Sequence, residues 1–127
     1  MKASDLNILF KDLSTGEDVK QTIRLEVSSY VELMKKKGSS IPLLFNEDEE
    51  VIINSSAIEK LLKETLSGRL TNIDLAYICD CLTLGERVNY TEEKLKDIVF
   101  EIADPEINGG FKSDMELMEF MEDCKVS

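Results

Sequence analysis

Four segments in the second half of the chain share one design, and this repetition constrains the fold more than any other feature. Each segment opens with a residue whose side-chain oxygen suits a helix N-cap, and apolar residues follow three or four positions apart. The opening residues are Ser56 (with Glu59), Thr71 (with Asp74), Thr91, and Ser113 (with Glu116). Gly68, Gly85 and the Asp104-Pro105 pair stop the first three segments. Helices this short are not stable alone in water, so the four must pack on other parts of the chain.

The apolar residues of the four segments form one stripe each. The stripes are Ile58, Leu61, Leu62 and Leu66; Leu75, Ile78, Cys79 and Leu82; Leu95, Ile98, Val99 and Ile102; and Leu117, Phe120, Met121 and Cys124. The second segment has apolar residues on its other faces too, so we expect it to be the most buried. It contains Cys79-Asp80-Cys81, which we interpret as buried thiols because the chain has no histidine to complete a zinc site.

In the first part of the chain the apolar residues recur with a different spacing. From Val19 to Val27 the odd positions are mostly apolar and the even positions polar, which is typical of a half-buried strand. Residues 6–10 alternate in the same way, and residues 12–18 contain a glycine suited to a turn. We therefore expect an antiparallel hairpin. A helix over residues 6–13 is the alternative, because Leu6, Leu9 and Leu13 also fit the helical period.

Residues 29–54 continue this N-terminal part. Ser29 and Glu32 form a capping-box pattern, and Gly38 follows three lysines, so we expect one short helix that ends there. Residues 41–45 and 51–53 are expected to form two more strands, with Pro42 at an edge or a strand start. The acidic run Glu47 to Glu50 would then be a hairpin tip.

These patterns predict an α+β fold. An N-terminal antiparallel sheet with one short helix would pack on a C-terminal layer of about four helices. The 127 residues are expected to form a single domain, with a sheet-rich part over residues 1–54 and a helical part over residues 55–127.

Most catalytic arrangements lack a required residue. The chain has no histidine, which removes the serine triad, the cysteine–histidine pair and the commonest metal ligand. Its six glycines match neither the G-x-G spacing nor the phosphate-binding loop of nucleotide sites. We therefore expect no enzyme activity and no cofactor. An enzyme that uses carboxylates alone remains as an alternative.

One segment resembles the start of a calcium-binding loop. Asp104, Glu106 and Asn108 stand at loop positions 1, 3 and 5, and Gly109 stands at position 6. Position 12, which should supply a bidentate glutamate, is Met115. We therefore expect a turn between two helices and no metal site.

The charge of the chain is uneven. The formal net charge is −11, and from Glu101 onward eight carboxylates stand against two lysines. Such a surface repels nucleic acid and anionic lipid and speeds association with an electropositive protein. We expect Phe111, Met115 and Met118 to supply apolar contacts at the centre of the patch. The candidate partner-binding residues are Asp104, Glu106, Phe111, Asp114, Met115, Glu116, Met118, Glu119, Glu122 and Asp123, with Glu47, Asp48, Glu49 and Glu50 as a second cluster. A solvated face that only keeps the protein soluble is the alternative.

The expected cellular compartment is inferred from targeting signals, membrane spans and cysteines. The first residues show no basic region followed by an apolar stretch, and no apolar run approaches the length of a bilayer span. Three cysteines make an odd number, which is typical of reduced thiols. We expect a cytoplasmic protein.

The stretches Leu70 to Leu82 and Ile102 to Gly109 resemble small bacterial immunity proteins of contact-dependent growth inhibition and related polymorphic toxin systems. The resemblance covers residues 55–125. It implies a cytoplasmic antidote that binds one cognate toxin domain, often a nuclease, and occludes its active site. Together with the acidic surface, this predicts an immunity protein whose partner is a toxin with an electropositive active-site face. A small acidic adaptor or regulatory subunit of a cytosolic complex is the alternative.

Overall fold

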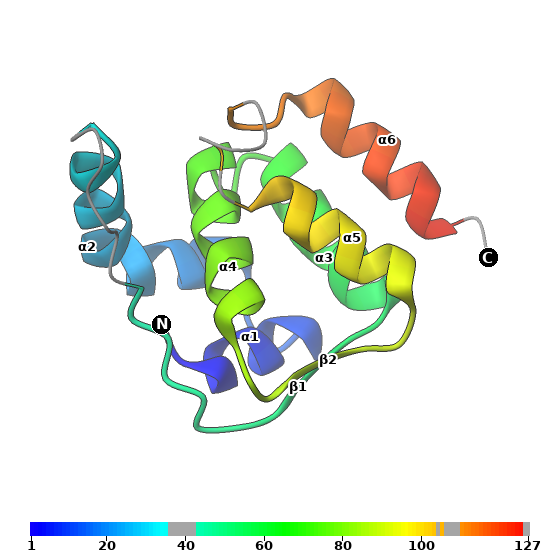
Figure 1. The fold of residues 1–127 in the computed structure, drawn as a ribbon, viewed down its shortest axis with the longest axis horizontal. Coiled ribbons are helices and arrows are strands. Elements are labelled where there is room, and N and C mark those ends of the chain that lie inside the picture. Colours follow the sequence, from blue (N-terminus) through cyan, green and yellow to red (C-terminus); the bar gives the residue numbers. More distant parts are fainter. Residues whose placement is uncertain (36–42, 104, 106–109, 126–127) are drawn as a thin grey trace.

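The structure is a computed structural model that describes residues 1–35, 43–103, 105 and 110–125. Within these residues the fold is dominated by helices (Figure 1). The elements in chain order are α1 (Ala3–Phe10), α2 (Gly16–Met34), β1 (Val51–Ile53), α3 (Ser55–Leu66), α4 (Asn72–Leu84), β2 (Val88–Tyr90), α5 (Glu93–Ile102) and α6 (Asp114–Lys125).

The predicted N-terminal antiparallel sheet is wrong, because residues 3–10 and 16–34 are helical. The alternative helix over residues 6–13 comes closer to α1. The Thr15 side chain accepts from the Asp18 amide and the Asp18 side chain accepts from the Thr15 amide, so a capping box starts α2. The helix predicted from Ser29 is the last part of α2, and its predicted end at Gly38 lies outside the described residues.

The helical period of α2 explains the error. Val19, Ile23 and Tyr30 are buried, which follows the helical repeat. Leu25 lies on the other side of the helix with 75% of its surface exposed, although the strand interpretation placed it in the core. The buried side of α2 packs against α4, where the Tyr30 hydroxyl donates to Asp80. The Tyr30 and Tyr77 rings meet edge to face with 5.3 Å between their centroids.

The sheet consists of two strands of three residues. The predicted strand at 51–53 is confirmed as β1, but it pairs in parallel with β2, with Val51 opposite Val88 and Ile53 opposite Tyr90. The expected strand at 41–45 is absent over residues 43–45, and residues 41–42 lie outside the described part of the chain. A parallel pair requires a crossover between its strands, which here is made of α3 and α4.

The four C-terminal helices are confirmed. Thr71 and Asp74 form the predicted capping box of α4, and Ser113 and Glu116 exchange the same two hydrogen bonds before α6. Two predicted caps are wrong. Asn54 rather than Ser56 caps α3, and α5 starts after Glu92. Thr91 instead donates its backbone amide to Ile53, which extends the pairing of the strands.

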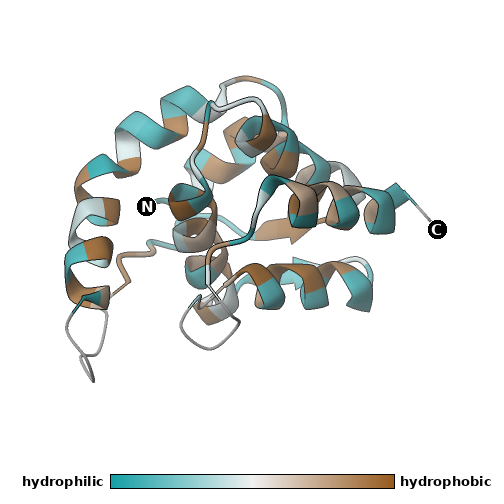
Figure 2. Cartoon of the chain, turned by 90° about the horizontal axis from the view of Figure 1, so that it is seen from above, coloured by the Kyte–Doolittle hydropathy of each residue, from teal (hydrophilic) through white to brown (hydrophobic). Residues whose placement is uncertain are grey.

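The helices enclose one hydrophobic core, to which every helix and β1 contribute buried side chains. Figure 1 shows α4 between α2 and α5, and α6 on the outside against α3 and α5. Hydrophobic residues of the helices turn mostly inward and hydrophilic residues outward (Figure 2). As predicted, α4 is heavily buried, including Cys79 and Cys81. Over the described ranges, no helix is both long and apolar enough to cross a membrane.

A buried carboxylate joins α2 to α3. Glu64 of α3 is 2% exposed, and it accepts from the Gly16 amide at 3.0 Å and from Arg69 Nε at 2.5 Å. Lys60 Nζ lies 3.5 Å from the same carboxylate. Gly16 is the first residue of α2, so the negative charge of Glu64 faces the positive end of that helix.

Candidate functional site

The outward face of α6 carries exposed apolar side chains among carboxylates. Met115 is 73% exposed and Met118 is 57% exposed, while Glu119 and Glu122 are exposed beside them. Met118 and Glu119 are three and four positions after Met115, and Glu122 is four and three positions after them, which places all four on one side of the helix. Leu117, a buried residue, is on the opposite side and holds α6 against the core. The structure therefore brings together the centre of the predicted acidic patch.

Two more candidate residues, before and at the start of α6, are also exposed. Phe111 is 39% exposed, and Asp114 is exposed in the first helical turn. Glu116 has another role, since it accepts from the backbone and hydroxyl of Ser113 and lies 3.9 Å from Lys112 Nζ. The hydrogen bonds from Ser113 hold the pKa of Glu116 below its ordinary value, so this carboxylate caps the helix.

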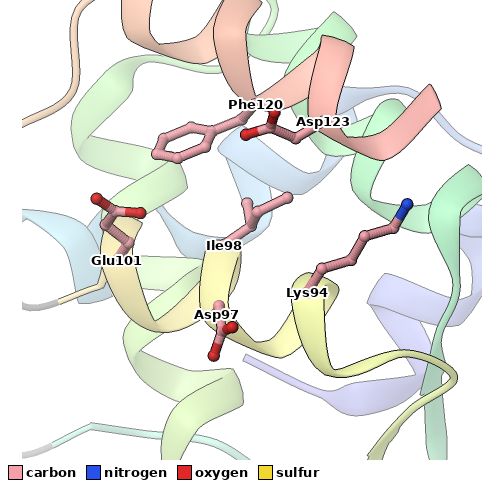
Figure 3. Close-up of a pocket in the computed structure, with 6 residues that line it drawn as sticks. All are labelled: Lys94, Asp97, Ile98, Glu101, Phe120 and Asp123. Atoms are coloured by element: carbon pink, nitrogen blue, oxygen red, sulfur yellow. The ribbon is translucent and has the colours of Figure 1, made fainter. Parts of the chain in front are cut away.

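An open groove lies beside this face, between α5 and α6 (Figure 3). Its volume is about 450 Å³, and it is lined by Lys94, Asp97, Ile98, Glu101, Phe120 and Asp123. Four of these residues come from α5, while Phe120 and Asp123 come from α6. Asp123 was among the candidate binding residues. The other five lining residues were not, because the groove exists only once α6 packs beside α5.

The groove is acidic at its rim. Asp97, Glu101 and Asp123 are exposed, and none of the three pairs with another described residue. Lys94 is different, because its Nζ lies 3.4 Å from the carboxylate of Glu92. The rim thus offers three carboxylates that the described structure leaves available.

The second predicted cluster, the acidic loop Glu47–Glu50, makes hydrogen bonds to other parts of the same chain. Asp48 accepts from the backbone and hydroxyl of Ser4, which lies at the start of α1, and these hydrogen bonds lower the pKa of Asp48. Glu47 accepts from the backbone amides of Glu86 and Arg87 at 3.2 and 2.8 Å. The loop therefore caps α1 and fastens the turn before β2.

The other two members of the acidic loop also have partners. Glu49 and Glu50 accept from the side-chain amides of Asn7 and Asn89. Figure 1 places the loop next to α1 and β1, far from α6. The two predicted clusters therefore do not form one surface, and the candidate carboxylates that do not hold other parts of the fold lie on α6.

Two candidate residues, Asp104 and Glu106, lie outside the described residues, as does most of the segment that resembles a calcium loop. Across the described part of the chain, no three or more Cys, Asp or Glu side chains gather as a metal ion would require.

The thiols lie within the core. Cys79, Cys81 and Cys124 are buried and unpaired by disulfides, and burial raises the pKa of Cys81 to about 12 and that of Cys124 to about 11. A thiol in this state is a poor nucleophile, because reaction requires the thiolate.

Comparisons with protein-family models, with curated proteins and with solved structures give no match.

Proposed function

We propose that the protein is an acidic immunity protein that binds a cognate toxin domain with a basic active-site face, such as a nuclease, and occludes that site. The observation that carries this proposal is the outer face of α6, where Met115 and Met118 stand exposed among unburied carboxylates. Exposed apolar side chains inside a charged surface are typical of a protein interface.

The two kinds of side chain have different tasks in this proposal. Carboxylates attract a basic partner over a distance and orient it, which raises the association rate. Methionines are flexible and polarisable, so they fit the irregular surface of a partner and supply contact area once it has docked. A toxin site that binds phosphates presents the complementary charge.

The test reverses two charges on α6. Glu119 and Glu122 are each replaced by lysine, and a control protein carries Glu32→Lys and Glu86→Lys, both exposed residues away from α6. The two proteins have the same net charge. An immunity gene is expected to lie directly downstream of its toxin gene, so the probe is the C-terminal domain of the protein encoded upstream. Association with this domain should slow about tenfold at low salt in the α6 variant and about twofold or less in the control.

Growth of cells that co-express the toxin domain provides the second readout. The α6 variant should protect less well than the control at equal expression. Unchanged protection together with an unchanged association rate would overturn the placement of the interface on α6. Failure of the unaltered protein to protect would overturn the immunity function and favour the adaptor alternative.

A further inference from the structure

We infer that the groove between α5 and α6 receives an arginine side chain from a basic segment of the partner protein. This inference rests on the proposed function and names the part of the partner that this surface recognises. It starts from the shape and lining of the groove, which has an apolar floor and an acidic rim (Figure 3).

The floor of the groove suits the stem and the flat face of a guanidinium side chain. Ile98 of α5 lies at the centre of the lining, and the Phe120 ring extends from α6 beside it (Figure 3). Arginine stacks on aromatic rings and covers apolar surface with its three methylene groups. An aliphatic and an aromatic side chain next to each other provide both contacts.

Carboxylates on α5 supply the opposite charge, and Glu101 lies at the same end of the groove as Phe120 (Figure 3). Asp97 and Glu101 are four residues apart on α5, so they lie on the same side of the helix. Lys94 lies at the other end, seven residues from Glu101, which is about 10 Å along the helix axis. A cation that enters near Glu101 and Phe120 therefore meets the Glu101 carboxylate and avoids the ammonium group of Lys94 (Figure 3).

The chemistry favours arginine over lysine. A guanidinium group is planar, donates two parallel hydrogen bonds to a carboxylate and loses its hydration more readily than an ammonium group. Lysine would satisfy the charge of the rim but would make little use of the Phe120 ring.

The groove is continuous with the outer face of α6. Asp123 lines the groove and is four residues from Glu119 of the outer face, so the two carboxylates are neighbours on the helix. A single basic segment can therefore lie across Met118 and Glu119 and place its arginine in the groove.

The test uses the full chain and two small probes, N-acetyl-arginine amide and N-acetyl-lysine amide. Both carry one positive charge, so general attraction to the acidic protein is the same. Nuclear magnetic resonance titration should give saturable shifts of the backbone amides of residues 94–101 and 120–123 with the arginine probe. Its affinity should exceed that of the lysine probe about threefold, since stacking on an aromatic ring distinguishes the two.

Three variants locate the contacts. Phe120→Leu should abolish the preference for arginine, and Glu101→Gln should weaken the arginine probe about two- to fivefold. Glu49→Gln in the acidic loop removes the same charge away from the groove and should leave the affinity unchanged. Melting temperatures show that each protein is folded, and Glu101→Gln remains informative if Phe120→Leu unfolds the chain, because Glu101 is exposed.

Two results would overturn the inference. Shifts of equal size over all acidic regions would show that the probes bind through charge alone. Equal affinity for the arginine and lysine probes would show that the groove does not recognise a guanidinium group. Neither result depends on the toxin, so loss of the arginine site and loss of toxin protection are separate outcomes.

Discussion

Replacing Glu64 by glutamine should destabilise the protein through the contact between α2 and α3. The glutamine side chain can still accept from the Gly16 amide, which lies 3.0 Å from Oε1 in the parent protein. It loses the negative charge that faces Arg69 Nε at 2.5 Å, Lys60 Nζ at 3.5 Å and the N-terminus of α2. The substitution therefore removes electrostatic attraction and keeps the shape of the site.

The loss in the free energy of unfolding can be estimated from these contacts. A carboxylate at a partly buried helix N-terminus contributes about 1 kcal/mol or somewhat more. Arg69 is half exposed, so solvent screens its ion pair with Glu64. We therefore assign this ion pair a contribution of about 0.5 kcal/mol to stability. We expect Glu64→Gln to lower the free energy of unfolding by about 1–2 kcal/mol at pH 7, which corresponds to roughly 5 °C in melting temperature.

The pH dependence of this stability difference shows whether the charge of Glu64 causes it. Burial raises the pKa of the Glu64 carboxyl, but hydrogen bonds from Arg69 and Gly16 outweigh this effect and hold the pKa below its ordinary value. A carboxyl whose pKa is lower in the folded state stabilises the protein above its unfolded pKa. That stabilisation is lost as the pH falls through the folded pKa, so the parent protein and the variant should approach each other in strong acid.

Urea unfolding at pH 7, 5 and 3 measures this difference. Glu59→Gln is the matched control, because Glu59 is on the same helix and its only described ion pair is a 4.0 Å contact with the exposed Lys63. The control should change the free energy of unfolding by less than about 0.5 kcal/mol. The reasoning fails if Glu64→Gln is as stable as the parent at pH 7, or if the difference is as large at pH 3.

Two further predictions concern buried polar groups. Tyr90→Phe should raise the free energy of unfolding by about 1 kcal/mol, because the Tyr90 hydroxyl is buried without a hydrogen-bond partner in the described structure; a lower urea midpoint would contradict this. Burial raises the pKa values of all three thiols, so a thiol-reactive disulfide reagent at pH 8 should modify them only as the protein unfolds. Rapid modification of the native protein, followed by mass spectrometry, would show that a thiol is accessible.

The incorrect prediction of a strand over residues 19–27 has a simple geometric origin. Val19, Ile23 and Val27 are four positions apart, and a spacing of four satisfies both the strand period of two and the helical repeat. Gln21 and Leu25 separate the two interpretations, because both stand at inward positions of the strand and both are exposed on the helix. An exposed leucine on a helix has the same sequence signature as a buried one on a strand. The capping box of Thr15 and Asp18 marks the start of α2 with the same spacing as the Thr71–Asp74 box that predicted α4, so this signal of a helix start was present in the sequence.

The second half of the chain was easier to predict because its signals agree. At α4 and α6 the cap, the apolar stripe and the turn indicate the same helix, so boundaries and buried faces follow from residues close in sequence. The groove could not be predicted in this way. Asp97 and Phe120 belong to separate helices, and only tertiary packing places both in the lining of one groove.

The parallel pairing of β1 and β2 has a consequence for the order of folding. Strands of three residues contribute too few hydrogen bonds to close a long loop by themselves, and α3 and α4 both lie between them. We expect α3 and α4 to pack first, because their contacts are local, and the strands to pair once these helices bring their ends together. The small sheet then forms late in folding, after the helices around it have packed.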